Sequence, residues 1–371
     1  MAQRHLDPTD PAAADVTGEA LAGYLRARAT EFLRALRLHR ETGGGSAGGA
    51  EEPADAARAL RRSARRISAS LHTFRPLLDA GWSEEMRPEL AWLSGTLGLE
   101  HAYEARLERL LLALHRLSGA VPVPAQAADV VTAGSRAAGT APAAAKAALT
   151  GGAGPAHRTP ATDHGNLTVG AAKAGALLER QLTLARTRAH STALQAIGSS
   201  RFHAVADKVA LLASEVPLAA DAPTTDLRPL AAAAEERLTD AVTALPLITA
   251  GHPYNAEALV HGLSPDPAPH PQDGPWHQVR LLLRLHRYAR EVLHGADGAA
   301  NVRLLAAGQA LNRHRDASEA AAAAAQAART PRITPATAYA LGVLHADQRH
   351  EVEASRFAFQ RAWQRQTVTA P

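Results

Sequence analysis

The sequence predicts an all-α protein, and three of its properties favour that fold class. Aromatic residues make up only 4% of the 371 residues, whereas Ala and Leu dominate the 46% that are hydrophobic. Helix cores are readily built from such small and γ-branched side chains, whereas β-sandwiches favour β-branched and aromatic residues. The apolar positions also recur at helical spacing along most of the chain. We therefore expect helices with enough apolar surface for a sizeable core.

The first half of the chain is predicted to form three helices. The first begins near Thr17, a residue type that caps helix N-termini, and ends at the glycine run 43–45. A turn near Gly81 separates the second helix from the third. The three helices are expected over residues 17–41, 54–79 and 83–118.

The second half begins after a segment without helical periodicity. Residues 119 to about 165 are mostly Ala, Gly, Pro and Thr, a composition typical of a flexible connection that buries no core. The stretch 252–275 is rich in Pro and His and is expected to be a loop, and Pro335 suits a helix start. Helices are expected over residues 168–216, 226–246, 276–294, 298–328 and 335–366.

Targeting signals and cysteine are both missing from the sequence. The first twenty residues have no apolar core of signal-peptide length, and no later run reaches the roughly 18 apolar residues of a membrane span. The lack of cysteine excludes disulfides and thiolate metal sites. We therefore expect a cytoplasmic protein with no membrane partner.

The most informative segment runs from Trp276 to Glu291 and predicts a helix with one cationic face. At the helical step of about 100° per residue, four cationic side chains fall within an arc of roughly 80°. These residues are His277, Arg280, Arg284 and Arg287. Apolar residues occupy the adjoining arc, so the cationic column should lie beside the core. Such a column suits a long polyanion.

A second basic helix repeats this design about two hundred residues earlier. Residues 56–78 contain six arginines and no acid, and Arg58, Arg61, Arg62 and Arg65 share an arc of roughly 100°. An arginine-rich face is often only solvated surface, but surface helices usually mix signs to gain ion pairs along the helix. Because the formal net charge is only +4, an anion site must come from such local clustering.

Neither a metal site nor a catalytic site is predicted. None of the 18 histidines is three or four positions from another, the spacing that places two ligands on one helical face. The glycine tract at 43–48 matches two catalytic motifs but follows no predicted strand, which both motifs require. An acid follows His314 at Asp316, for which a structural ion pair and a functional role are both open.

Together these residues resemble the CHAD family, named for its conserved-histidine α-helical domain. The run His277-x-x-Arg280-x-x-x-Arg284-x-x-Arg287-Tyr288-x-x-Glu291 is similar to the second signature of that family. The segments Leu311–Asp316 and Ala340–Trp363 resemble the parts that follow it. The first repeat is less faithful, because Arg58 stands at the position of the first signature histidine and His101-Ala102 at that of an Arg-Asp pair.

The resemblance covers residues 17–366, which are interpreted as one CHAD-like domain. Its parts are a first bundle (17–118), a flexible Ala/Gly/Pro-rich insertion (119–165), connecting helices (166–250) and a second repeat (276–366). A disordered N-terminus (1–16) and a tail (367–371) are expected to flank it.

The resemblance implies two helical bundles related by pseudo-twofold symmetry around a central basic channel. In the family, that channel binds inorganic polyphosphate without hydrolysing it. The implied function is therefore a polyphosphate-binding module that is not an enzyme and uses no cofactor and no metal. The residues expected to contact phosphate are Arg58, Arg61, Arg65, Arg66, His277, Arg280, Arg284, Arg287, His314 and Arg315.

Two other functions stay open at this point. A cationic groove does not by itself distinguish polyphosphate from a nucleic acid, although Tyr288 is the main aromatic residue available for base stacking. An enzyme acting on polyphosphate, with His277 or His314 as the reacting group, is less favoured. Further partners are expected to be polyphosphate granules or polyphosphate-metabolising enzymes.

Overall fold

The computed structural model describes residues 16–43, 51–119, 161–252, 270–295 and 301–364. Across these ranges the all-α prediction is confirmed: the regular structure consists of α-helices and short 3₁₀ turns, with no strand. Two isolated β-bridges, Thr17 with Asp226 and Leu78 with Leu218, join extended segments. The predicted disordered N-terminus, most of the insertion and the tail lie outside the described residues, and the pseudo-twofold relation stays a prediction.

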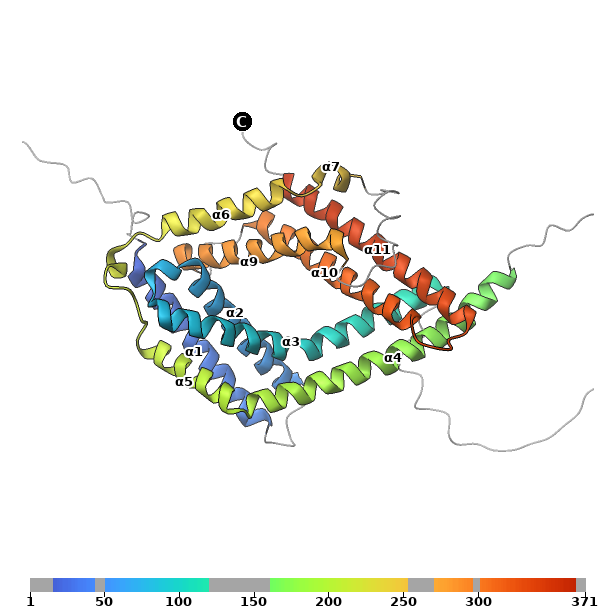
Figure 1. The fold of residues 1–371 in the computed structure, drawn as a ribbon, viewed down its shortest axis with the longest axis horizontal. Helices are drawn as coiled ribbons and strands as arrows, with labels where there is room; N and C mark the ends of the chain where they lie inside the picture. The colour runs from blue at the N-terminus through green and yellow to red at the C-terminus, as the bar shows by residue number, and fades with distance from the viewer. Residues whose placement is uncertain (1–15, 44–50, 120–160, 253–269, 296–300, 365–371) are drawn as a thin grey trace, which may run out of the picture.

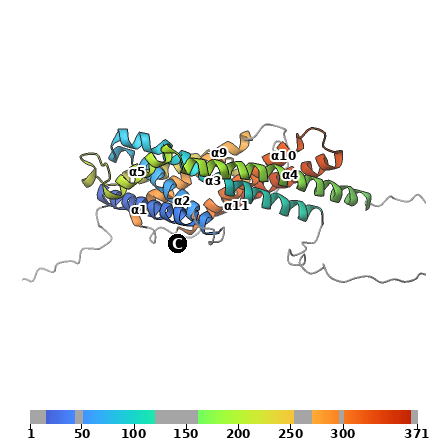
Figure 2. The same cartoon turned by 90° about the horizontal axis from the view of Figure 1, so that it is seen from below.

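The helices form an elongated, flattened molecule. In chain order they are α1 (Gly18–Gly43), α2 (Glu51–Thr73), α3 (Ala80–Leu117), α4 (Ala161–Ile197), α5 (Ser200–Ser214), α6 (Arg228–Thr243), α7 (Leu247–Ala250), α9 (Gly274–His294), α10 (Val302–Ala328) and α11 (Pro335–Gln364). Helices α2 and α3 face α9 and α10 across the middle of the molecule (Figure 1). Helix α3 runs beside α4 in both views (Figures 1 and 2).

Two helix boundaries differ from the prediction for identifiable reasons. The helical region expected over 168–216 is divided at a boundary that was not predicted, because α4 ends at Ile197 and the Ser199 side chain caps the next helix by accepting from Phe202 N at 3.2 Å. Helix α2 ends at Thr73 instead of 79, because Pro76 lacks an N–H and a 3₁₀ turn replaces the last helical turn.

The first hydrophobic core lies under the N-terminal helices. The apolar stripe of α1, including Leu25 and Phe32, packs against Leu60 and Ile67 of α2, and all four side chains are fully buried. Val292 at the end of α9 joins the same cluster. Because α2 turns its apolar face to this core, its arginine face is left for the opposite side of the helix.

Two further cores lie under the C-terminal helices. One gathers Trp276 of α9, Leu311 of α10 and Phe359 of α11, and the other joins the C-terminal half of α3 to α4, α10 and α11. The segment 166–250, predicted to hold connecting helices, contributes to all three cores. Helix α9 belongs to the first and second cores, so its cationic face is fixed between them. In the described ranges, no helix is both long enough and apolar enough to span a membrane.

Candidate functional site

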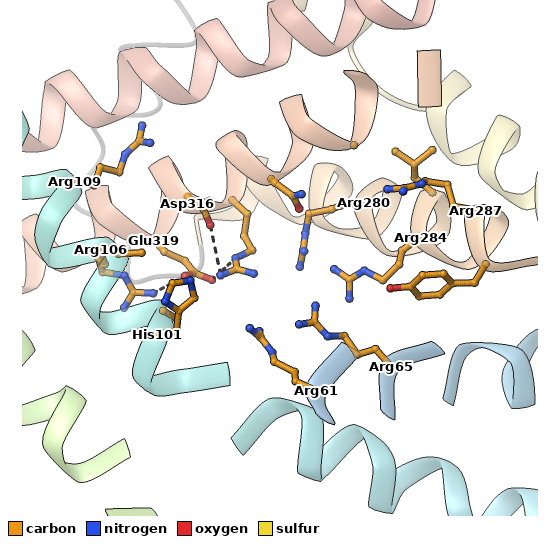
Figure 3. A pocket seen from close by; sticks show the side chains of 17 residues that line it. Arg61, Arg65, His101, Arg106, Arg109, Arg280, Arg284, Arg287, Asp316 and Glu319 are labelled. Atoms are coloured by element: carbon orange, nitrogen blue, oxygen red, sulfur yellow. Dashed lines mark hydrogen bonds and ion pairs between the residues drawn. The ribbon is translucent and has the colours of Figure 1, made fainter. Parts of the chain in front are cut away.

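A pocket of about 470 Å³ opens between α2, α3, α9 and α10 (Figure 3). Most of the side chains around it carry charge, and arginines predominate. The lining residues are Arg61, Arg65, His101, Ala102, Ala105, Arg106, Arg109, Arg280, Leu283, Arg284, Arg287, Tyr288, Gly308, Asn312, Arg315, Asp316 and Glu319.

Four arginines from two facing helices form the middle of the pocket, and we call them the arginine cluster: Arg61 and Arg65 of α2, Arg280 and Arg284 of α9. Each pair is four residues apart, which places both side chains on one face of the helix. The two pairs point toward one another from opposite walls (Figure 3). Helices remote in sequence thus bring four guanidinium groups to one place.

A glycine makes room for one member of the arginine cluster. The Arg61 guanidinium donates from Nε to the carbonyl oxygen of Ser94 at 3.2 Å and lies against Gly98 of α3. A Cβ atom at Gly98 would lie only 2.4 Å from Arg61 Cζ. The glycine of the Leu97-Gly98 step therefore lets the guanidinium pack on the backbone of α3.

The arginine cluster carries positive charge without an acidic counter-ion. Burial lowers the pKa of Arg65 and Arg280 to about 10, and repulsion from the other arginines adds to the effect. Burial and neighbouring arginines also lower the pKa of Arg61 and Arg284. Among the described residues, no carboxylate forms an ion pair with any of the four. All four stay protonated at neutral pH, so an anion is the partner that would relieve their repulsion.

One end of the pocket differs from the arginine cluster because it contains acidic residues. We call Arg106, Arg315, Asp316 and Glu319 the acid-bearing end. The Glu319 carboxylate pairs with Arg106 of α3 and lies 3.0 Å from Arg315 Nε of α10. Asp316 lies 3.5 Å from Arg315 Nη2, and burial raises its pKa. Figure 3 shows these acids beside His101 and Arg106, to one side of the arginine cluster.

The α3 wall of the pocket was missed by sequence reasoning. It supplies His101, Arg106 and Arg109. His101, Ala105 and Arg109 follow one another at steps of four residues and share one helical face, and Arg106 lies beside Ala105. The same stretch carries Glu100, Glu104 and Glu108, so it lacks the acid-free basic run that singled out residues 56–78.

Six of the ten predicted binding residues line the pocket, and four do not. Those in the pocket are Arg61, Arg65, Arg280, Arg284, Arg287 and Arg315. Arg58 is exposed and pairs with Asp55 at 2.8 Å. Arg66 pairs with Glu291 at 2.8 Å, and Tyr24 donates to the same carboxylate at 3.1 Å. His277 and His314 lie beside the pocket within the protein. Contact with phosphate stays a prediction for all ten.

The comparison with protein families decides what this helical arrangement is. The family model of the CHAD domain matches residues 27–325, a range that holds every residue lining the pocket. The chain belongs to the CHAD domain family.

Solved structures give two further likenesses to this CHAD chain. PptA from Streptomyces chartreusis is 65% identical to it, with a TM-score of 0.72, over 95% of this chain and 100% of that one. The CHAD domain from the plant Ricinus communis is 17% identical, with a TM-score of 0.47, over 100% of this chain and 98% of that one. The search of curated proteins found no match.

The two histidines predicted to contact phosphate, His277 and His314, lie together behind the pocket and do not line it. His314 is 1% exposed, stacks on Trp276 with ring centroids 5.7 Å apart, and meets the His277 ring edge-on at 5.4 Å. Arg356 Nε lies 3.3 Å from His314 Nε2, and the same ring nitrogen lies 3.6 Å from Asp273 Oδ1. In this arrangement His314 supports the wall behind the pocket.

Asp273 stands at the centre of that network. It is fully buried just before α9 and accepts from Arg349 at 2.7 and 3.2 Å and from Arg356 at 2.7 Å. Ser318 of α10 also donates to it. Burial alone would raise the pKa of Asp273, but His314 and Arg349 hold it far below its ordinary value. The carboxylate thus joins the start of α9 to α10 and α11.

The buried His314 predicts that stability falls in mild acid. Burial, opposed by Asp273 and assisted by Arg356, lowers the pKa of His314 to about 4. In the unfolded chain that pKa is about 6.5, so the unfolded state binds the extra proton and stability drops as pH falls from about 6.5 toward 4. The free energy of unfolding, measured with urea, should be roughly 2–3 kcal/mol lower at pH 4.5 than at pH 7. Burial also lowers the pKa values of His277 and His286, which act in the same direction.

The variant His314→Gln isolates this contribution, because its side chain does not titrate. Its stability should change much less over the same pH interval. Equal losses in the two proteins would assign the acid sensitivity to other groups.

Proposed function

We propose that this protein is a module that binds inorganic polyphosphate in the pocket and does not hydrolyse it. The observation that carries the proposal is the arginine cluster, in which two helices oppose like charges without a carboxylate between them. Such repulsion opposes folding and is relieved by an anion that offers several negative groups in a row. The CHAD resemblance supports the same ligand.

Arginine suits this ligand better than lysine would. A guanidinium presents a planar fork of donors that matches two oxygens of one phosphate group. Eight of the seventeen residues that line the pocket are arginines, and none is a lysine. Successive phosphates of a linear chain could therefore meet successive guanidinium groups along the pocket.

Salt should weaken this binding strongly. Five of the lining arginines, the arginine cluster and Arg287, have no ion pair with a described residue. At a slope of about 0.7 per neutralised charge, as for single-stranded nucleic acids, affinity should fall roughly tenfold when the salt concentration doubles. Titration of labelled long-chain polyphosphate at several salt concentrations measures that slope. Binding that ignores salt would contradict the proposal.

A nucleic acid is the second candidate, and the composition of the pocket argues against it. Tyr288 is the only Phe, Tyr or Trp residue that lines the pocket, and its ring already faces the Arg66 guanidinium at 5.6 Å. Proteins that bind single strands usually stack several bases on aromatic rings. In a competition assay, polyphosphate should displace single-stranded DNA or RNA of matched charge; the reverse preference would overturn the assignment.

Catalysis is the third candidate, and the pocket offers little for it. Its lining contains no Ser, Thr, Cys or Lys, and its carboxylates Asp316 and Glu319 face arginines. Across the described ranges, no group of three or more His, Cys, Asp or Glu residues could hold a metal ion. Incubation of long-chain polyphosphate with the protein and a divalent metal should leave the chain length unchanged. Association with polyphosphate granules in the cytoplasm would follow from binding alone.

A further inference from the structure

Glu319 occupies a position in the pocket that a phosphate group could take. Its carboxylate contacts Arg106 from α3 and Arg315 from α10, so one negative group joins two walls of the pocket. Oxygen atoms held between two guanidinium groups imitate the contacts that a phosphate would make. At the acid-bearing end, the protein therefore supplies its own anion.

The arginines at this end are consequently already neutralised. Arg106 and Arg315 are 17% and 24% exposed and share the Glu319 carboxylate, whereas the arginine cluster has no such partner. A bound chain gains little from an arginine that already has a counter-ion, and it is repelled by the carboxylate itself. The part of the pocket that attracts a polyanion therefore does not extend as far as Glu319.

The Glu319 ion pairs are nonetheless weak enough to be exchanged. The Glu319 side chain is 37% exposed, and partly exposed ion pairs contribute little to stability. A neighbouring residue gives the same end a second negative charge, since Asp316 also faces Arg315. The acid-bearing end can therefore open to a chain that competes well, but it does so against the repulsion of two carboxylates.

We propose that Glu319 is a specificity-determining residue that limits how many phosphates of a chain the pocket engages. A short polyphosphate fits within the arginine cluster and does not reach Glu319. A long chain extends to the acid-bearing end, where it must displace the carboxylate from Arg106 and Arg315. Glu319 therefore weakens the binding of long chains more than that of short ones. This inference rests on the proposed function.

The variant Glu319→Gln tests this inference with two ligands, tripolyphosphate and long-chain polyphosphate. The amide keeps the size of the side chain but removes the charge, so Arg106 and Arg315 become available to phosphate. Affinity for the long chain should rise roughly threefold to tenfold, whereas affinity for tripolyphosphate should change less than about twofold. The salt slope for the long chain should also steepen by roughly 1.4, from two further contacts at about 0.7 each.

Two further variants make the result specific. Glu236→Gln removes the same charge from an exposed position on α6 outside the pocket and should change neither affinity. Adding Arg106→Gln to Glu319→Gln should remove about half of the added salt slope, because Arg106 supplies one of the two released contacts.

The outcomes separate this inference from the proposed function. An equal rise for both chain lengths, or no rise, would overturn the role of Glu319 while the wild-type protein still bound polyphosphate. If the wild-type protein bound neither ligand, the proposed function would fall first and the role of Glu319 with it.

Discussion

Arg284→Glu is expected to abolish polyphosphate binding at moderate salt without destabilising the fold. Arg284 lies in the middle of the pocket, where burial and the positive charges of Arg315 and Arg287 lower its pKa. The substitution removes a charge-assisted contact worth about 1.5–3 kcal/mol and adds a repulsive carboxylate in its place. At about 0.15 M salt, affinity should fall roughly 100-fold or more.

The stability of the same variant should stay unchanged or rise. In the free protein, burial and the positive charge of Arg284 lower the pKa values of Arg61, Arg65 and Arg280, which means that this charge opposes folding. A glutamate at position 284 would face Arg61 and Arg65 across the pocket and replace repulsion with attraction. Loss of function combined with retained stability is typical of residues that serve a ligand and not the fold.

Arg62→Glu provides the matched control for Arg284→Glu. Arg62 lies in the basic run of α2 that also holds Arg61 and Arg65, but it is exposed and does not line the pocket. The substitution changes the net charge by the same amount as Arg284→Glu. Its effect on polyphosphate affinity at moderate salt should be small, because the charge of an exposed side chain that makes no direct contact with the ligand is weakened by water and salt. If both variants lost affinity equally, general surface charge would explain binding. Retained binding by Arg284→Glu would place the ligand elsewhere.

The centre of the pocket could be predicted from the sequence because it depends on helical periodicity alone. Arg61 with Arg65 and Arg280 with Arg284 share a helix face by their spacing. Each helix also carries an apolar face that fixes the opposite side toward a core. That the two faces would meet was inferred from the repeated design and the family resemblance.

The ends of the pocket and the role of the histidine could not be read from the sequence. Glu319 pairs with Arg106 although the two residues are 213 positions apart in the sequence, and local spacing carries no sign of such a contact. His314 was expected to contact phosphate only through the resemblance of Leu311–Asp316 to the CHAD family. Its actual neighbours are Trp276, Asp273 and Arg356, which only the packing of three helices brings together.

Asp273→Ala is expected to cause a large loss of stability. Its carboxylate is fully buried and accepts from two nearly buried guanidinium groups, those of Arg349 and Arg356. Removal of one partner from a buried ion pair leaves the other charge without water or a counter-ion, which costs about 3–5 kcal/mol. Glu353, which pairs with Arg356 at 2.7 Å, compensates only one of the two arginines.

The comparison with an exposed pair shows why burial sets the size of the effect. Lys208 and Glu85 are also 2.7 Å apart, but the Glu85 side chain is 70% exposed. Water solvates the lysine once the acid is gone, so Glu85→Ala should cost less than about 1 kcal/mol. Urea unfolding of both variants at pH 7 measures the difference. Similar small losses would mean that water reaches the Asp273 network.

Asp273→Ala is expected to lose stability and keep most of its affinity, whereas Arg284→Glu is expected to lose affinity and keep its stability. The residue does not line the pocket, and it can affect the pocket only through the placement of α9 and α10, which it joins. At a temperature where the variant is folded, its affinity for polyphosphate should fall no more than a few-fold. If Asp273→Ala does not fold, Asp273→Asn keeps the shape and one acceptor and should show an intermediate loss of stability. A stable Asp273→Asn protein that bound no polyphosphate would instead place the buried network in direct control of the pocket.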